Sequence, residues 1–423
     1  MPVFDLGRVR NWTSVPAPRF VGGNRVELLE GGAALFPRML EAIAGAEREV
    51  WLATYIFHDD ESALGIAQAL GAAAARGVAV HVVVDGFGSK GTLATLRAAL
   101  VPAGVAFEVF RPIERWYALL QPGQLRRLHQ KLCVVDERIA FVGGINLIDD
   151  RLDLRHGWNP EPRLDYAVEL SGPLAVAVHA TARAMWARAH LGQNWRDGVR
   201  QVVRSGAPVN EGLAMLRSLR GAARLPEEAD TSPVRAAFVV RDNFRQRRAI
   251  ERSYVDAIRR AVHSVDIAVP YFYPGRRFRR ALRQAAKRGV TVRLLLQGKI
   301  DYRIAALAAR ALYAELQAYG VRIYEYTPAY LHAKVAVVDG RWATVGSSNI
   351  DPLSLLLNLE ANVVVDDEPF AATLAARFQA AFAVSTPVGS TPARAGWRGW
   401  VQRAAVAWMA NVYLRVAGIT GRY

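Results

Sequence analysis

Short continuous runs of apolar residues alternate with amphipathic stretches along most of the chain. Two segments show this clearly: AAAARGVAVHVVVDG around Gly77 and QAAKRGVTVRLLLQG around Gly289. In both, an amphipathic stretch stops at a glycine, which often follows the end of a helix, and an apolar run of strand length comes next. Residues 47–57 and 263–272 show the same succession of helix end and strand. The alternation predicts an α/β sheet covered by helices on both faces.

These matching segments recur in the same order, which indicates an internal duplication. Residues 104–112 match 320–328, and the longer segment 128–146 matches 331–349. The period is close to half the chain, which is too long for the short repeats of solenoid proteins. We therefore predict two tandem α/β units of the same fold, related by a pseudo-twofold axis.

Changes in composition suggest where each unit begins and ends. The stretch 196–232 mixes Gly, Pro, Arg and Glu with little periodicity, as expected of a connector. The predicted organisation is an N-terminal extension at 1–23, a first domain at 24–195, the connector at 196–232, a second domain at 233–384, and a linker with a tail at 385–423.

Two segments lie outside the duplication. The first unit carries extra residues at 113–128, rich in aromatic and arginine side chains, directly before its longest repeated segment. They are interpreted equally well as a lid or lipid-facing loop and as a plain surface loop. From Arg394 onward the tail contains tryptophans and arginines but no acidic residue. This composition favours an amphipathic helix on an anionic membrane surface, with docking on the protein's own core as the alternative.

Composition narrows the classes of partner and compartment. The 423 residues include 54 Lys and Arg against 38 Asp and Glu, giving a formal net charge of +16. This excess predicts an anionic partner, which could be nucleic acid, an anionic membrane surface or a phosphorylated substrate. The single cysteine, Cys133, excludes a disulfide framework and a multi-cysteine zinc site. Since neither a spanning apolar stretch nor a secretory signal is recognisable, we expect an intracellular protein with a soluble fold.

Each copy of the longest repeated segment contains the pattern His-x-Lys-x4-Asp. The pattern consists of His129, Lys131 and Asp136 in the first copy and of His332, Lys334 and Asp339 in the second. Because side chains alternate along a strand, His and Lys two residues apart point to the same side. Each copy continues into a glycine-containing turn that ends in Asn146 or Asn349, where amide and backbone N–H groups can approach an anion.

Two such copies facing each other would surround one phosphorus atom with two imidazoles, two ammonium groups and two amides. One neutral histidine would attack phosphorus, while the other, protonated, would donate to the leaving alkoxide. The lysines and asparagines would bind the non-bridging oxygens. The segments after the turns offer Asp165 and Glu360 as carboxylates that fix the histidine tautomers. Asp136 and Asp339, just past the predicted strands, are expected to structure the turn rather than contact phosphorus.

The paired motif resembles the phospholipase D superfamily over residues 24–382, and within it the bacterial cardiolipin synthases. The resemblance rests on TYIFHDDESALG, VVVDGFGS, FVGGIN, LDYAVELSGP and GSSNIDPLSLLLNLEANVVV. It implies two α/β/α sandwich domains with the active site at their interface, and phosphatidyl transfer between two phosphatidylglycerol molecules. By analogy, His129 is the nucleophile and His332 the general acid. Ser347 stands where the first copy has Gly144, so a hydroxyl contact to phosphate would come from the second half alone.

Other functions fit parts of the same pattern. A phospholipid hydrolase would use the same site with water as acceptor, a nuclease would also suit the positive charge, and a non-enzymatic membrane scaffold would need no intact motif. Phosphatidylglycerol is the expected acceptor, with phosphatidylethanolamine as the alternative. We expect a peripheral protein on the cytoplasmic face of the inner membrane. No metal-ligand spacing accompanies the motifs, so neither a metal nor another cofactor is expected.

Overall fold

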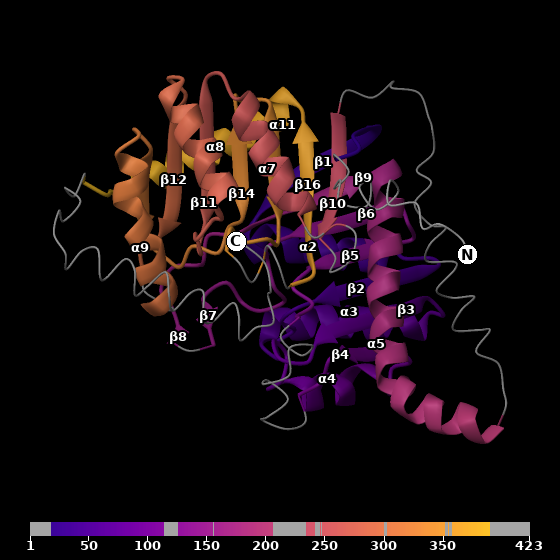
Figure 1. Cartoon of the computed structure of the whole chain (residues 1–423). Coiled ribbons are helices and arrows are strands. Elements are labelled where there is room, and N and C mark those ends of the chain that lie inside the picture. Colours follow the sequence, from indigo (N-terminus) through magenta and orange to yellow (C-terminus); the bar gives the residue numbers. More distant parts are fainter. Residues whose placement is uncertain are drawn as a thin grey trace, which may run out of the picture.

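A computed structural model describes most of the chain and shows two halves built from the same elements (Figure 1). The residues described are 18–113, 126–154, 156–205, 234–241, 246, 248–299, 303–351, 354 and 358–389. The first half contains β1 (Val21–Glu30), α2 (Gly31–Ala44), β2 (Glu49–Thr54), α3 (Glu61–Ala75), β3 (Ala79–Asp85), α4 (Leu93–Leu100), β4 (Ala106–Phe110), β5 (Leu132–Val135), β6 (Ile139–Gly143), β7 (Leu152–Asp153), β8 (Gly157–Trp158), β9 (Tyr166–Ser171) and α5 (Pro173–Ser205).

The second half repeats this succession with two exceptions: it has no counterpart of β7 and β8 among its described residues, and it ends with an additional short strand, β17. It contains β10 (Val234–Arg241), α7 (Ala249–Arg260), β11 (Ser264–Val269), α8 (Arg276–Lys287), β12 (Thr291–Gln297), α9 (Arg303–Gln317), β13 (Arg322–Tyr326), β14 (Val335–Val338), β15 (Trp342–Gly346), β16 (Glu360–Asp366), α11 (Glu368–Ala383) and β17 (Thr386–Pro387). The predicted duplication is therefore confirmed element by element.

One continuous sheet of 15 strands joins the two halves. Its order is β17-β13-β12-β11-β14-β15-β16-β10-β1-β9-β6-β5-β2-β3-β4. Read outward from the centre, β1 corresponds to β10, β9 to β16, and so on to β4 and β13, with the same parallel and antiparallel pairings. The first strands of the two halves pair antiparallel, with Val21 opposite Ala236. The sheets of the two expected sandwich domains are therefore continuous across the pseudo-twofold axis.

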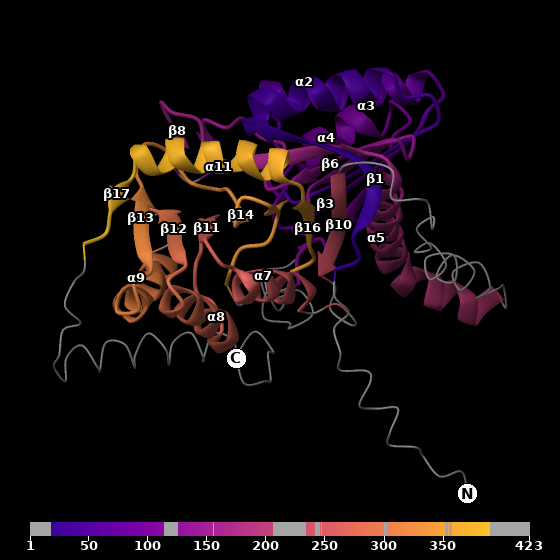
Figure 2. The ribbon, with the colours of Figure 1, turned by 90° about the horizontal axis from the view of Figure 1, so that it is seen from above.

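The helices cover both faces of this sheet, as the sequence predicts. Seen from above, α2, α3 and α4 lie on the same side as α11, whereas α7, α8 and α9 lie on the opposite side (Figure 2). Gly77 and Gly289 have φ of 90° and 89°, values that favour glycine, at the ends of α3 and α8. The strands that follow bury Val82 and Leu294 in the two cores.

Several expected boundaries differ in detail from the structure. Helix α5 continues to Ser205, so the first part of the expected connector is helical. Thr386 and Pro387 form a short strand beside β13, because their backbone extends the free edge of the sheet. Most of the insertion, residues 114–125, and the tail from residue 390 lie outside the described residues. None of the described helices is long and apolar enough to cross a bilayer.

Candidate active site

The two motif histidines lie where strands of the two halves come together. His129 precedes β5 and His332 precedes β14, which are equivalent strands of the two halves. The N–H of His129 donates to the carbonyl of Leu359 over 3.0 Å, and the N–H of His332 donates to the carbonyl of Leu164 over 2.8 Å. Each histidine is thus held by a backbone carbonyl of the other half. That carbonyl belongs to the residue directly before Glu360 or Asp165.

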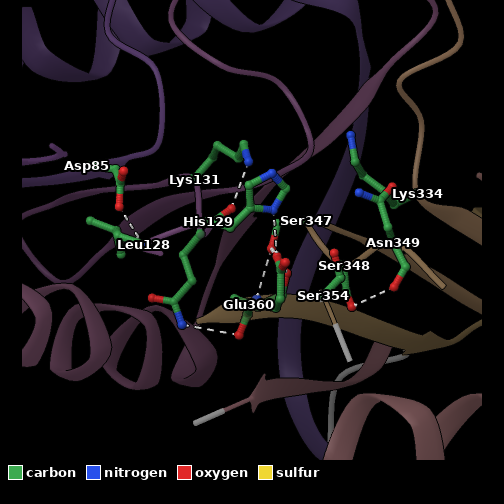
Figure 3. Close-up of polar contacts among 12 residues, drawn as sticks. Asp85, Leu128, His129, Lys131, Lys334, Ser347, Ser348, Asn349, Ser354 and Glu360 are labelled. Carbon is green, nitrogen blue, oxygen red and sulfur yellow. Dashed lines mark hydrogen bonds and ion pairs between the residues drawn. The ribbon is translucent and has the colours of Figure 1, made fainter. Parts of the chain in front are cut away.

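This exchange places the carboxylate of each half behind the histidine of the other. Nδ1 of His129 lies 2.9 Å from Oε2 of Glu360, and Nδ1 of His332 lies 2.5 Å from Oδ2 of Asp165. Both carboxylates are fully buried, whereas 11% of the His129 side chain and 23% of the His332 side chain are exposed. Figure 3 shows the His129 ring directed toward Glu360. With Nδ1 occupied, Nε2 of each ring is the atom available for chemistry.

Both motif lysines fold back onto the histidine two residues before them. Nζ of Lys131 donates to the carbonyl of His129 over 2.7 Å, and Nζ of Lys334 donates to the carbonyl of His332. Nζ of Lys334 also lies 2.7 Å from Nδ1 of His332. Burial lowers the pKa of Lys131 to about 8 and that of Lys334 to about 7, although nearby carboxylates oppose the shift. These ammonium groups therefore titrate near neutral pH.

The pKa values of the two carboxylates are shifted in opposite directions. Burial would raise the pKa of Glu360, but the charge and hydrogen bond of His129, together with Lys131, hold it below its usual value. Burial raises the pKa of Asp165, and the opposing charge of Lys334 does not cancel the effect. Glu360 is therefore the ionised carboxylate of the pair of sites, and Asp165 holds a proton more readily.

The pKa values of both histidines are lowered, and that of His332 is lowered further. Burial lowers the pKa of His129, and the negative charge of Glu360 offsets part of the shift. Burial lowers the pKa of His332 further, assisted by the positive charges of Lys334 and Arg163. In the protein without substrate, both rings are neutral at pH 7.

Ser347 occupies a position behind Glu360 rather than facing the histidines. Its hydroxyl donates to Oε2 of Glu360 over 2.5 Å and accepts from the N–H of Ala361 over 3.0 Å. The side chain is fully buried and its hydroxyl is engaged with Glu360, and the phosphate contact expected of Ser347 stays a prediction. At the equivalent Gly144, a Cβ would lie 2.3 Å from Oδ1 of Asp165, so the shorter carboxylate uses the space that a serine would need.

The two asparagines also differ in their contacts. Oδ1 of Asn146 accepts from the N–H of Ile56 over 3.3 Å, which ties the turn to the end of β2. Oδ1 of Asn349 is buried and has no hydrogen-bond partner among the described residues. Figure 3 shows Asn349 beside Lys334, on the opposite side of the site from Lys131. Their contact with phosphate stays a prediction.

Asp136 and Asp339 lie at the other ends of β5 and β14, away from the histidines. The Asp136 carboxylate accepts from the N–H groups of residues 47, 48 and 49 over 2.8–2.9 Å. The Asp339 carboxylate accepts from those of residues 262, 263 and 264 over 2.7–2.9 Å. Both carboxylates thus hold the start of the neighbouring strand, β2 or β11, and their contribution to the chemistry can only be indirect.

Known proteins share much of this sequence and fold. A family model described as cardiolipin synthase, PLD-like domain, matches residues 39–159 and 254–382. Cardiolipin synthase B of Salmonella typhi is 39% identical over 362 residues, covering 83% of this chain and 79% of the relative. The chain belongs to the cardiolipin synthase family with phospholipase D-like domains. The resemblance seen in the motifs is thereby confirmed.

Other members and neighbours of this family extend the likeness. Cardiolipin synthase A of Pseudomonas fluorescens Pf-5 is 30% identical over 377 residues, covering 88% of this chain and 72% of the relative. The crystal structure of a phosphatidylserine synthase from Haemophilus influenzae Rd KW20 aligns over 96% of this chain and 97% of that chain. With a TM-score of 0.62 at 11% identity, that alignment supports the two-domain fold.

Two residues that position the histidines in this family member are not among the sequence candidates. Oδ2 of Asp85 accepts from the N–H of Leu128 over 2.9 Å, as Figure 3 shows, and Oε1 of Gln297 accepts from that of Leu331 over 2.9 Å. Each therefore fixes the residue directly before a motif histidine. The signal was present in the repeat, where VVVDG and LLLQG both end an apolar run with a polar residue before glycine.

One described group of side chains has ligand atoms close enough to hold a metal ion. Nε2 of His179 lies 3.2 Å from Glu49, and its Nδ1 lies 2.6 Å from Glu137. Glu49 opens β2 and Glu137 follows β5, so the group lies at the end of the sheet opposite the motif histidines. Both ring nitrogens of His179 thus lie close to a carboxylate, far from the motif histidines, and we assign this group no role in the chemistry at phosphorus.

Proposed function

We propose that this protein is a cardiolipin synthase that transfers a phosphatidyl group between two phosphatidylglycerol molecules, releasing glycerol. The observation that carries the proposal is the crossed pair of histidine–carboxylate contacts, 2.9 and 2.5 Å long, in one buried site. Such a pair suits a two-step displacement at phosphorus, because one imidazole can attack while the other moves protons. The names of the related proteins, cardiolipin synthases A and B, support the lipid class.

In the first step His129 acts as the nucleophile. The ionised Glu360 accepts the Nδ1–H of His129, which leaves an electron pair on Nε2. A bond forms between Nε2 and phosphorus, and the bond from phosphorus to the departing glycerol oxygen breaks. That oxygen takes a proton from Nε2 of His332, so the step yields a phosphatidyl-histidine and free glycerol.

His332 suits the acid role because its pair with Asp165 can carry an additional proton. Burial raises the pKa of Asp165, and its Oδ2 lies 2.5 Å from Nδ1 of His332, so a proton on this pair would be shared between the two groups while Nε2 keeps its own hydrogen. The negative charge of a bound phosphodiester would move the shared proton toward the ring. In the second step, the hydroxyl of the second lipid returns a proton to His332 and its oxygen displaces His129.

Lys131, Lys334, Asn146 and Asn349 would bind the non-bridging oxygens. All four side chains are buried in the same site, where positive charge acts through a low dielectric. The asparagines would bind these oxygens through their Nδ2–H groups, because the amide oxygen can only accept hydrogen bonds. We further propose that the protein works as a peripheral protein on an anionic membrane surface.

The test is incubation with labelled phosphatidylglycerol in mixed micelles, followed by analysis of the lipid products. Cardiolipin with equimolar glycerol is the expected result. Phosphatidic acid as the main product would make the enzyme a hydrolase, and a faster reaction with phosphatidylethanolamine added would change the acceptor. Cleavage of DNA without lipid turnover would overturn the proposal in favour of a nuclease.

A further inference from the structure

The two halves differ in length at one place beside the site. Between Asn146 and Asp165 the chain has 18 residues, 147–164, whereas between Asn349 and Glu360 it has ten, 350–359. The additional residues form the hairpin β7–β8, with Leu152 opposite Trp158. This hairpin is not part of the main sheet and lies below the strands of the second half in Figure 1. The duplicated fold does not require it.

Large apolar side chains of this hairpin face solvent. Trp158 is 65% exposed and Leu154 is 55% exposed. Trp158 is more exposed than Phe87, which is 48% exposed. An exposed tryptophan and leucine on one short hairpin cost free energy in water, so a feature of this kind marks an interaction site.

The hairpin is firmly attached next to His332. The ring of His156 stacks on that of Tyr330, two residues before His332, with the ring centres 5.6 Å apart. At the base of the hairpin, the N–H of Arg163 donates to the carbonyl of Asp150 over 2.9 Å, and its guanidinium donates to the carbonyl of Leu152. The Asp150 carboxylate in turn accepts from the N–H of Gly32 over 2.5 Å, at the start of α2.

The surroundings indicate what covers the hairpin. Arg151 is exposed beside it, and the ammonium of Lys299 lies 5.7 Å from the Tyr330 ring centre. Segment 149–163 also carries four acidic residues, so its charge is mixed. The exposed tryptophan and leucine, rather than the charge, are typical of protein surfaces that enter the headgroup region of a bilayer. A stable protein interface buries about 800 Å² on each partner, far more than two side chains can supply. The features therefore favour a lipid surface.

We propose that the β7–β8 hairpin inserts Trp158 and Leu154 into the headgroup boundary of the bilayer that holds the substrate. Insertion at this point would bring the exposed part of the His332 side chain toward the membrane surface, so that lipid phosphates could reach the histidines with their acyl chains still in the bilayer. The identity of the substrate rests on the proposed function, whereas binding of the hairpin to a bilayer does not. A bilayer of phosphatidylglycerol and phosphatidylcholine is the probe.

The experiment compares the full-length protein with the double variant Trp158→Ser, Leu154→Ser. Val262→Ser is the matched control, because Val262 is 66% exposed but precedes β11, at the end of the sheet away from His332. The double variant should bind sedimented vesicles at least about tenfold more weakly, since burial of one large apolar side chain is worth roughly that factor. The control should bind as wild type, and all three proteins should melt at similar temperatures.

A second measurement separates the hairpin from the chemistry. With short-chain phosphatidylglycerol dissolved as monomers, the double variant should turn over as fast as wild type; with vesicles, its KM should rise while kcat stays constant. Equal vesicle binding by the double variant, or equal loss in Val262→Ser, would overturn the proposal and leave the tail as the membrane-binding element. If wild type binds vesicles but converts no lipid, the proposed function fails while the sedimentation result for the hairpin still stands.

Discussion

The two halves of the active site share a backbone but not an electrostatic environment. In one, His129 faces a glutamate whose pKa is held low by its partners, among them the Ser347 hydroxyl; in the other, His332 faces an aspartate whose pKa is raised by burial. Different side chains around the two carboxylates accompany this contrast: Ser347 donates to Glu360, whereas Gly144 offers no hydroxyl to Asp165. A duplicated fold supplies two equivalent positions, and small asymmetries behind them can give the two imidazoles opposite tasks.

The asymmetry has a simple steric basis. Glutamate is one methylene longer than aspartate, so Glu360 reaches His129 while leaving room behind it for the Ser347 side chain. Asp165 is shorter, and its carboxylate lies where a side chain at residue 144 would be, 2.3 Å from a Cβ built on Gly144. Carboxylate length and the residue behind it therefore form matched sets, Glu with Ser and Asp with Gly.

Removing either histidine should have the largest effect. His129→Ala and His332→Ala should each lower turnover by at least about 10⁴-fold, because each removes a group that acts in the transition state. Rapid quenching with labelled phosphatidylglycerol should trap a covalent adduct on His129 in wild type and none in His129→Ala. An adduct on His332 instead would exchange the two roles.

Exchanging the carboxylates for amides should separate the two sites. Asp165→Asn and Glu360→Gln should each lower kcat by roughly 10²-fold or more, because each disturbs the proton on Nδ1 of its histidine. A phosphatidyl ester of nitrophenol needs no general acid, so its cleavage should recover in Asp165→Asn but not in Glu360→Gln. Equal recovery in both variants would mean that the sites do not differ in role.

The pH dependence should reflect the two lysines. Lys334 and Lys131 have pKa values lowered to about 7 and about 8, so their charge is present at lower pH and is lost as pH rises through this range. KM for a phosphatidylglycerol micelle should therefore rise by up to about tenfold per pH unit above this range. Lys334→Arg, whose charge does not titrate, should flatten the rise. A KM independent of pH between 6 and 9 would argue against phosphate binding by these lysines.

Exchange of the supporting residues should give the smallest effect. Gly144→Ser forces a Cβ against Asp165 and should cost about 1–3 kcal/mol of unfolding free energy, measured by chemical denaturation. Ser347→Gly removes a hydrogen bond to a buried carboxylate and should cost a similar amount, about 1–3 kcal/mol. It should also raise the pKa of Glu360, so that the acidic limb of the kcat profile moves upward. No change in either variant would remove the steric explanation.

Sequence reasoning found the repeated unit and both motif strands, because their apolar runs and the pattern around Gly77 and Gly289 are local signals. It named Asp165 and Glu360 but could not assign them to histidines, since the crossing depends on how the halves dock. The central pairing of β1 with β10 is equally non-local. The hydrogen bond from the Ser347 hydroxyl depends on the length of the Glu360 side chain, which approaches it only in the folded protein. The sequence shows the β7–β8 hairpin only as a longer segment after Asn146 than after Asn349.

The crossed carboxylates also govern when the enzyme becomes active during its own synthesis. A chain growing on the ribosome exposes His129 and Lys131 long before Glu360 has been translated. Until then the imidazole has no acceptor for its Nδ1 hydrogen and no second histidine opposite it. The proposed site can therefore be complete only when the C-terminal half has folded against the N-terminal one.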